Sequence, residues 1–563
     1  MVCSRDSARE SCTPADLERC AALASPDNIA PHPVHSFSAG AVRVAVINPV
    51  RSVLEHDGCV CLGHLFGAQP GWWRTLSEEP DGSYAILRHD ERYVELVTDM
   101  VASRTLWYAL TDEVFLVSTS QRALVALLGS FELNEESVAW MLATGHLGPG
   151  LSWDRRLAPV PAGCRLTLDR ARWRVALHRR EVPIAPTAGR KNHHIEGMRD
   201  AIYETCASLD LDMSEWLLPL SGGMDSRVIL LGLLAAGKSP HCITWGLRSS
   251  LLDRTNDAFI ARELATELGV EHEYVTTEPA PEGFADALAR FILVAEGRVE
   301  NFGGYTDGLA IWRDLFERGI CGVIRGDEVS LGYGGKMLSD AQCRFENDAI
   351  FVSDYPPTHP IRRLALAPQQ WPDELHRRPD ESLAAYDGRL EEHVLVPTTL
   401  SALNDLKSAY VELVNPLISR RIMESAHRLP KSLRQHRASL REVLSSVGPA
   451  LPFAETSAIA RPGEYLEDAA VRAEMLRGLS STGAQRLFSD ETRWLILAGL
   501  NGGDAASRNG RVQPLVKRVV PHGVKRRVKP VPTPRLSGPR LAFRAYIAAQ
   551  IVEVMSKDAA ALR

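Results

Sequence analysis

One short segment constrains the fold of this 563-residue chain more than any other, the run Leu217-Leu-Pro-Leu-Ser-Gly-Gly-Met-Asp-Ser226. An apolar stretch leads into Ser221-Gly222-Gly223, and a second apolar stretch begins at Val228, soon after Asp225. The order predicts a strand, a glycine turn and a helix N-terminus, whose free N–H groups favour an anion. The serine hydroxyls can donate to phosphate oxygens, and Asp225 can hold a Mg²⁺ ion on them. We therefore expect a phosphate site here; the alternative is an ordinary glycine-rich connection.

A second glycine-rich segment, Gly232-Leu-Leu-Ala-Ala-Gly-Lys-Ser239, matches the Walker A pattern letter for letter. That motif needs a strand before its first glycine and a helix after its lysine. Here residues 225–236 are apolar and helix-prone, Gly237 suits the end of a helix, and Pro240 blocks its continuation. We therefore expect an exit turn at this position, which argues against a P-loop kinase.

The composition is that of a globular protein with more than one domain. Apolar residues make up 45% of the chain, charged residues 24%, and the formal net charge of −6 indicates no particular partner. The ten cysteines are scattered without a CxxC pair, so we expect reduced thiols and a cytoplasmic protein. No apolar run reaches 18 residues, so no membrane contact is expected. Residues 1–33 are polar and lack the apolar centre of a signal peptide, which predicts a loose extension.

The first half of the chain is predicted to be rich in β-structure. Residues 34–184 contain short β-branched runs separated by turn residues, a pattern typical of strands. These runs are Ala41–Ile47, Cys59–Leu62, Ser83–Arg88, Tyr93–Val97 and Val114–Val117. A helix is expected over Glu135–Thr144, and the polar segment 185–192 is the predicted linker to a second domain.

The second domain, residues 192–515, is predicted to alternate strands with helices. The expected strands are Trp216–Leu220, His241–Gly246, His272–Thr276 and Ile320–Arg325. Such alternation predicts a doubly wound parallel sheet with helices on both faces, and ligands then bind at the carboxyl ends of the strands. The predicted fold class is therefore α/β.

Three strand ends carry the residues expected to do chemistry. Backbone groups of 243–246 can form a platform for a flat ring, and Asp225 and Asp327 can hold Mg²⁺ on phosphate oxygens. The predicted nucleotide-binding residues are Leu220, Ser221, Gly222, Gly223, Asp225, Ser226, Thr244, Trp245, Gly246 and Asp257.

The Ser221–Ser226 segment resembles the PP-loop, SGGxDS, of ATP pyrophosphatases. Over roughly residues 40–470 the chain resembles the asparagine synthetase family, a resemblance carried by further segments in the same order. These are Trp245-Gly-Leu, Asn256-Asp257, Ala261-Arg262, Leu268–His272, Gly326-Asp-Glu-Val329, Asn415-Pro-Leu417, Ala426–Pro430 and Arg437–Arg441. The resemblance implies a PP-loop synthetase domain that uses ATP and Mg²⁺, activates a carboxylate as an acyl-adenylate with release of pyrophosphate, and passes the acyl group to an amine.

The first domain resembles the glutaminase domain of that family, which has an Ntn-type αββα fold. Its nucleophile is a cysteine immediately after the initiator methionine, whereas Cys3 lies about thirty-five residues ahead of the first expected strand. Where glutaminases read Asn-Gly-Glu, this chain reads Leu62-Gly63-His64. We therefore expect a glutaminase-like domain that does not hydrolyse glutamine.

Without an ammonia source, the attacking amine is expected to come from a substrate. β-Lactam synthetases and lasso peptide cyclases share this arrangement, and a macrolactam-forming peptide cyclase is the favoured interpretation. Ile324 occupies the position of the synthetases' glutamate, which argues against asparagine synthesis and β-lactam closure. The family's late lysine falls at Gly463, and Arg461 is the predicted substitute that stabilises the α-phosphate. The base remains open among Glu296, Glu328 and Tyr333, or no base is needed.

Residues 516–563 are predicted to be a basic, proline-rich tail. Between Ala505 and Val552 there are eleven lysines and arginines and no acidic residue. The tail is either a solvated arm or a docking surface for an acidic partner such as a precursor peptide or its processing proteins. Few aromatic residues are interleaved for base stacking, which argues against nucleic acid. The alternatives for the whole chain are a small-molecule amide synthetase and a non-catalytic regulator with a degenerate synthetase fold.

Overall fold

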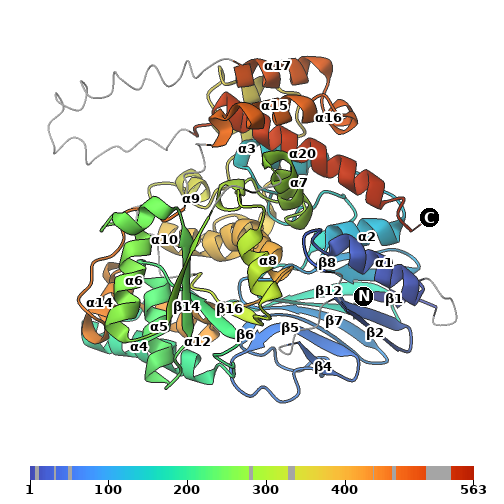
Figure 1. Cartoon of the computed structure of the whole chain (residues 1–563). Helices are drawn as coiled ribbons and strands as arrows, with labels where there is room; N and C mark the ends of the chain where they lie inside the picture. The colour runs from blue at the N-terminus through green and yellow to red at the C-terminus, as the bar shows by residue number, and fades with distance from the viewer. Residues whose placement is uncertain are drawn as a thin grey trace.

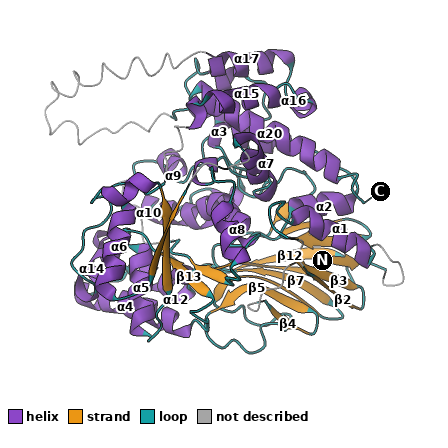
Figure 2. Ribbon diagram, viewed as in Figure 1, coloured by secondary structure: helices purple, strands orange, loops and turns teal. Residues whose placement is uncertain are grey.

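The computed structural model describes residues 1–6, 12–30, 33–47, 53–277, 280, 283–327, 337–434, 437–459, 465–501 and 534–562. The protein is a mixed α/β structure with two antiparallel sheets and one parallel sheet (Figures 1 and 2). Among the residues described, no helix is long and apolar enough to cross a membrane.

The first half of the chain forms two six-stranded antiparallel sheets. The first has the order β10 (Ala158–Pro159), β8 (Trp107–Leu110), β9 (Val114–Ser118), β1 (Val2–Ser4), β3 (Val42–Ile47) and β2 (Val34–Ala39). The second has the order β12 (Arg174–Arg179), β11 (Cys164–Asp169), β7 (Tyr93–Thr98), β6 (Gly82–His89), β5 (Cys59–Leu65) and β4 (Leu54–His56). The strands predicted between residues 41 and 117 are therefore confirmed.

The two antiparallel sheets pack face to face. Val44 and Val46 of β3 share one buried cluster with Leu87 of β6 and Leu96 of β7. Helices α1 (Pro14–Ala24) and α2 (Gln121–Leu128) contact the outer side of the first sheet. The outer face of the second sheet buries Ile86 and Cys61 against the segment that contains Trp72. In the described part of the chain a loop therefore covers the face where the αββα arrangement would place a helix.

The N-terminal residues are part of the first sheet. Strand β1 pairs with β9 on one side and with β3 on the other, and Cys3 is fully buried. Helix α1 begins with a capping box in which Thr13 and Asp16 exchange hydrogen bonds, and it buries Leu17. The prediction of a loose extension over residues 1–33 is therefore wrong for these elements. Three residues are too few for strand periodicity to reveal β1.

The second half is built on a parallel sheet, as predicted, and it has five strands, one more than the four expected from the sequence. Its order is β15 (His272–Thr276), β14 (His241–Gly246), β13 (Trp216–Pro219), β16 (Gly322–Ile324) and β17 (Glu412–Val414). The chain runs outward from β13 through β14 to β15 and then returns to place β16 on the other side of β13. The order of strands thus reverses between β13 and β16, the place where open α/β sheets bind ligands.

Helices cover both faces of the parallel sheet. Along β13, Leu217 belongs to one buried cluster and Leu218 to another, as expected for a strand with two buried faces. The Leu218 side is covered by α4 (Lys191–Ser208), α5 (Asp225–Ala235), α6 (Asp257–Leu268), α12 (Arg420–Arg428), α13 (Lys431–Arg434) and α14 (Ala438–Val447). The Leu217 side is covered by α7 (Phe284–Val294), α8 (Ala310–Glu317) and α11 (Ser401–Ser408). Helix α4 begins at the predicted domain boundary. Two further helices, α9 (Asp340–Glu346) and α10 (Leu383–Leu390), precede α11.

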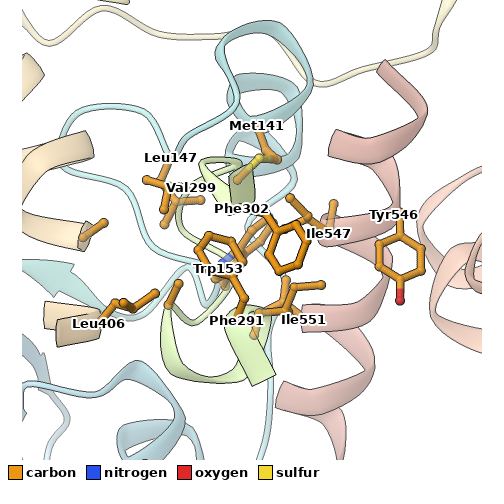
Figure 3. Close-up of a cluster of buried hydrophobic side chains, with 14 of the residues drawn as sticks. Met141, Leu147, Trp153, Phe291, Val299, Phe302, Leu406, Tyr546, Ile547 and Ile551 are labelled. Atoms are coloured by element: carbon orange, nitrogen blue, oxygen red, sulfur yellow. The ribbon is translucent and has the colours of Figure 1, made fainter. Parts of the chain in front are cut away.

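The last described segment is a buried helix, α20 (Gly538–Asp558). It packs against α3 (Glu135–Thr144), α7, α15 (Ala469–Gly478), α16 (Thr482–Leu487) and α17 (Asp490–Asn501). Ile547 and Ile551 of α20 lie beside Phe291 and Phe302 in the main core (Figure 3). The prediction of a basic tail over residues 516–563 is therefore wrong from Gly538 onward, and its stretch 516–533 lies outside the described residues. The helix over Glu135–Thr144 is confirmed.

Candidate functional site

A cavity of about 250 Å³ lies at the carboxyl ends of β13, β14 and β16, where the strand order reverses. It brings together residues from segments that are up to 240 positions apart. Its lining consists of Pro219, Leu220, Ser221, Asp225, Ser226, Ile243, Thr244, Trp245, Asp257, Arg325, Gly326, Asp327, Ser457, Ala458 and Ile459. Most of the predicted nucleotide-binding residues therefore meet around one space, which we call the nucleotide-side cavity.

The turn between β13 and α5 is closed by its own side chains. The Ser226 hydroxyl accepts a hydrogen bond from the Ser221 N–H at 3.0 Å and lies 2.9 Å from the Ser221 Oγ. The Gly223 N–H in turn donates to the Ser221 Oγ at 3.2 Å. These bonds hold the hydroxyls at the N-terminus of α5, beside Asp225 in its first turn. The arrangement presents donors where a phosphate group would be stabilised.

Glycines at the strand ends allow close backbone approach. A Cβ atom on Gly326 would lie 3.0 Å from the Ser226 nitrogen, so the end of β16 lies directly against the start of α5. A Cβ on Gly246 would lie 2.3 Å from the carbonyl oxygen of Ala458, and one on Gly222 would meet the Ala454 side chain at 2.8 Å. The predicted glycines Gly222 and Gly246 are thus needed for packing around the cavity.

Asp225 forms an ion pair with Arg437. The Arg437 Nη1 lies 2.9 Å from one carboxylate oxygen of Asp225 and 3.1 Å from the other. Burial nevertheless raises the pKa of Asp225, with the nearby charge of Asp327 adding to the effect, while Arg437 opposes it. Arg437 adopts a left-handed backbone conformation with φ of 54°, which is strained for a residue with a side chain.

Asp327 is held by Arg325, two residues earlier. The Arg325 Nη2 donates to Asp327 Oδ1 at 2.9 Å, and the Asn415 side-chain amide donates to the Asp327 carbonyl at 2.5 Å. Burial would raise the pKa of Asp327, but the charges of Arg325 and Lys407 outweigh it and hold that pKa below its usual range. Asp327 is therefore an anion facing Asp225 across the reversal point.

The two aspartates suit a Mg²⁺ ion carried by phosphate groups. The described residues contain no group of three or more histidine, cysteine or acidic side chains arranged to hold a metal. Mg²⁺ commonly binds through one or two carboxylates together with substrate phosphates and water. Asp225 and Asp327 supply two carboxylates close enough for the charge of one to raise the pKa of the other. The predicted ligands thus fit the ion without a dedicated cage.

The third wall of the cavity is the segment 451–459. Arg227, buried in α5, donates to the carbonyls of Leu451 and Pro452 at 2.9 and 2.8 Å. Asp257 accepts from the Gly222 N–H at 2.6 Å and donates its own N–H to the Thr456 carbonyl at 3.0 Å. Asp257 therefore ties the glycine turn and this wall to the start of α6. Burial raises its pKa, and the Gly222 N–H opposes the shift.

Strand β14 forms the remaining side. The Thr244 hydroxyl donates to the Leu220 carbonyl at 2.6 Å and lies 2.9 Å from the His272 Nε2, so it ties neighbouring strands together. The Trp245 ring packs edge-on against Trp312 with centroids 5.6 Å apart. The backbone of 243–246 remains the candidate platform for a flat ring.

A second and larger cavity of about 610 Å³ adjoins the first, and we call it the acyl-side cavity. Trp245, Arg325 and Ile459 line both cavities. The other residues around the acyl-side cavity are Glu300, Asn301, Gly303, Gly304, Tyr305, Asp307, Ile311, Trp312, Leu403, Lys407, Tyr465, Leu466, Ser537, Pro539 and Arg540. Its walls combine aromatic surface with a few charged groups, which is typical of ligand sites.

Other predicted residues have different outcomes. Arg461, Glu328 and Tyr333 lie outside the described residues, so their roles stay predictions. Glu296 is buried away from the nucleotide-side cavity and accepts from the Ser120 hydroxyl at 2.5 Å and the Gln121 N–H at 2.9 Å. It caps α2, and the structure gives no support to its role as a base. Ile324 is the last residue of β16 and is fully buried in the cluster that contains Leu218.

The first domain shows no nucleophile at the position where the resemblance would place one. The Met1 ammonium donates to the Val117 carbonyl at 2.7 Å, and Cys3 is buried in β1, where burial raises its thiol pKa. Cys3 lies within the first sheet and not ahead of it, so the sequence argument from its distance was wrong. Gly63, in the Leu62-Gly63-His64 segment, has a φ of 99°, and a Cβ atom there would lie 2.2 Å from the Ser83 carbonyl oxygen. The position therefore requires glycine.

The Walker A match is a helix exit, as predicted. Helix α5 ends at Ala235, and Gly237 adopts a left-handed φ of 73°. The Lys238 ammonium donates to the carbonyls of Cys206 and Ala207 at 3.1 and 2.9 Å, and also to that of Leu209. Lys238 therefore satisfies the end of α4 and faces no cavity among those described above.

Sequence reasoning missed Arg437, Arg325 and Lys407. Arg325 was visible as the residue before Gly326-Asp327, but Lys407 lies 80 positions after Asp327, in α11, and Arg437 lies 212 positions after Asp225, at the N-cap of α14. No protein-family model and no curated protein sequence matches this chain.

Proposed function

We propose that the protein is an ATP- and Mg²⁺-dependent ligase that adenylates a carboxylate, releases pyrophosphate and passes the acyl group to an amine. One observation carries the proposal: the Ser221–Ser226 turn and Asp327 lie around the same cavity at the point where the strand order reverses. Donors for phosphate and two carboxylates for its metal ion thereby meet at the start of a helix.

Each group of residues around the nucleotide-side cavity has a separate proposed role. The hydroxyls and N–H groups of 221–226 would hold the phosphates, and the backbone of 243–246 would hold the adenine ring. Asp225 and Asp327 would hold Mg²⁺, which stabilises the negative charge that develops on the leaving pyrophosphate. Asp257 and Arg227 would keep the glycine turn and the 451–459 wall in place, since both bond to backbone groups there.

The amine is proposed to come from a peptide, which makes the enzyme a macrolactam-forming, lasso-type cyclase. The acyl-side cavity of about 610 Å³ has room for more than a single small amino acid, and its described lining includes the aromatic side chains of Trp245, Tyr305, Trp312 and Tyr465. A residue-lined space of this size supports a substrate with several side chains. A small-molecule amide synthetase of a biosynthetic pathway is the alternative within the same chemistry.

One observation favours a second function, that of a non-catalytic regulator. Both candidate metal ligands are paired with arginines of the same chain, Asp225 with Arg437 and Asp327 with Arg325. A site in which arginines replace the metal permanently would bind ATP without splitting it.

The test is the identity of the products. The purified protein is incubated with ATP, Mg²⁺ and a panel of peptides with side-chain carboxylates, and nucleotides are separated by chromatography. AMP and pyrophosphate in equal amounts are expected. ADP and phosphate would contradict the adenylation chemistry, and ATP binding without turnover would favour the regulator. Release of glutamate from glutamine alone would show that the first domain is active.

A further inference from the structure

Among the residues that the structure describes, three cationic side chains line the acyl-side cavity, and two of them are neutralised by ion pairs within the protein. Arg325 is paired with Asp327 at 2.9 Å. Arg540, at the start of α20, is paired with Glu300 at 2.5 Å. The third cation is Lys407 of α11, which is 4% exposed and lines the same cavity. Its surroundings differ from those of the two arginines.

Lys407 has weak partners in the described part of the chain. Its ammonium lies 3.5 Å from the Asn404 amide oxygen and 6.0 Å from the centre of the Trp312 ring. No carboxylate of the described residues lies within 4.0 Å of it, the limit for a salt bridge. The acids around it are otherwise engaged. Asp327, whose charge acts on Lys407, pairs with Arg325 at 2.9 Å, and Asp307, which lines the same cavity, accepts from the N–H groups of Leu309 and Ile311.

The burial of Lys407 without a paired carboxylate disfavours its charged form, and this lowers its pKa. Burial, and then repulsion from Arg325, lower the pKa of Lys407 to about 7, with Asp327 opposing the shift. A buried ammonium without a paired anion is destabilised, and an anionic ligand at its side would offset that penalty. The cavity beside Lys407 is where such an anion can enter.

We propose that Lys407 binds the carboxylate of the acyl donor in the acyl-side cavity, which it lines together with Arg325. Arg325 lines both cavities, so an anion held by Lys407 lies next to the space assigned to the phosphates. The identity of the anion as the acyl donor rests on the proposed function. The presence of an unneutralised cation facing the cavity does not.

The assigned role fits the balance of the adenylation step. A carboxylate oxygen forms a bond to the α-phosphorus, the bond from that phosphorus to the bridging oxygen breaks, and pyrophosphate leaves with the electron pair. Carboxylate and triphosphate are both anions, so they repel each other as they approach. A cation on the wall of the acyl-side cavity, which adjoins the space assigned to the phosphates, reduces this repulsion and orients the attacking oxygen.

The inference predicts selection of an acid over its neutral amide. The test measures binding of radiolabelled N-acetyl-glutamate α-methylamide and N-acetyl-glutamine α-methylamide by equilibrium dialysis, with α,β-methylene-ATP and Mg²⁺ present so that no adenylate forms. The wild-type protein is expected to bind the acid about tenfold more tightly than the amide, because a charge-assisted hydrogen bond is lost with the amide. Lys407→Met should bring that ratio to about one, and Lys407→Arg should keep part of it.

Two controls keep the result interpretable. Arg540→Met removes another cation of the same cavity, one that is already paired, and should leave most of the preference for the acid. Binding of α,β-methylene-ATP to Lys407→Met should be unchanged, which shows that the variant is folded.

The inference is overturned if the wild-type protein fails to prefer the acid, including the case in which neither probe binds. It is also overturned if Lys407→Met keeps the preference. Failure of the proposed function looks different: the acid is preferred through Lys407, yet no carboxylate yields AMP and pyrophosphate.

Discussion

Two regions of this molecule place buried carboxylates beside arginines, and the same residue types behave in opposite ways. Beside the first turns of α20, Glu300 forms ion pairs with Arg544, at 2.8 Å, and with Arg540. Burial acts to raise the pKa of Glu300, but the charges of the two arginines outweigh it and lower that pKa to about 2. At the end of β13, Asp225 receives Arg437 at 2.9 Å, yet its pKa is raised. Burial acts to raise the pKa of both carboxyl groups. At Glu300 two arginines outweigh it, whereas at Asp225 one arginine does not, and the charge of Asp327 adds to the increase.

Glu300 is one anion between two cations and is fully satisfied. Arg544 also donates to the carbonyls of Leu142, Ala143 and Thr144, which closes the end of α3. Asp225 instead shares its surroundings with the second anion Asp327 and faces a cavity. The comparison indicates that the Glu300 cluster stabilises the fold. The Asp225–Asp327 cluster can still bind a cation and is therefore the candidate for chemistry.

The largest expected effect is on turnover at Asp225. Asp225→Asn should lower the rate of AMP formation by roughly 10²–10³-fold, the loss typical of one stabilising group at a reacting centre. The melting temperature should stay constant or rise, because a buried carboxylate with a raised pKa is replaced by a neutral amide. Asp286→Asn, in the exposed first turn of α7, is the matched control and should leave the rate unchanged. Equal rate losses in both variants would contradict the assignment.

The next effect concerns stability at Glu300. Arg544→Met should cost about 3–5 kcal/mol in the free energy of unfolding, because it breaks a buried ion pair and leaves carbonyls of α3 without donors. Urea denaturation followed by circular dichroism measures the change. Arg540→Met removes a half-exposed partner of the same carboxylate and should cost less than about 1 kcal/mol. If the Arg540 variant were the less stable one, the comparison would be wrong.

The Glu300 and Asp225 regions should also differ in how their contribution to stability changes with pH. The pKa of Glu300 lies below its unfolded value of 4.5, so its stabilising contribution is complete above pH 4.5 and is lost as the pH falls towards 2. Glu300→Gln should therefore flatten the decline of melting temperature in this range. The pKa of Asp225 is raised, so Asp225→Asn should stabilise the protein most near neutral pH and least in acid. Melting curves from pH 7 down to pH 3 distinguish the two slopes.

The smallest effect is expected at Cys3. Its thiol is buried in β1 and has a raised pKa, so it is no nucleophile. Cys3→Ala should leave AMP formation within about twofold and cost on the order of 1 kcal/mol of stability through a small cavity. The measurement is product formation with and without glutamine. A glutamine-dependent rate that disappears in the variant would reverse this view of the first domain.

The site was predictable where its chemistry is local in the sequence. Ser221, Asp225 and Asp327 follow apolar strands directly, and the parallel order of β13 and β16 brings them together. The partners of these residues were not predictable, since Arg437 pairs with Asp225 across 212 positions and Lys407 belongs to a helix on the other side of the sheet.

The ends of the chain were misread for two physical reasons. Strand β1 has only three residues, too few to show alternation. It is fixed by pairing with β3 and β9 and by the packing of Val2 and Cys3 into two hydrophobic clusters. Helix α20 is apolar around most of its circumference, so it lacks the one-sided pattern of a surface helix, and the basic stretch before it dominated the composition. The structures of β1 and α20 are therefore determined by tertiary contacts and not by local sequence patterns.

The position of α20 has a consequence for biosynthesis. Ser537, Pro539 and Arg540 line the acyl-side cavity, and α20 fills the core between α3 and α7. A ribosome makes these residues after the five strands of the parallel sheet, so a nascent chain that has already formed this sheet still lacks one wall of the cavity and part of its core. Maturation of the site therefore waits until α20 has been translated, and a chain that ends before α20 would expose the apolar surface of Phe291 and Phe302 to chaperones and proteases.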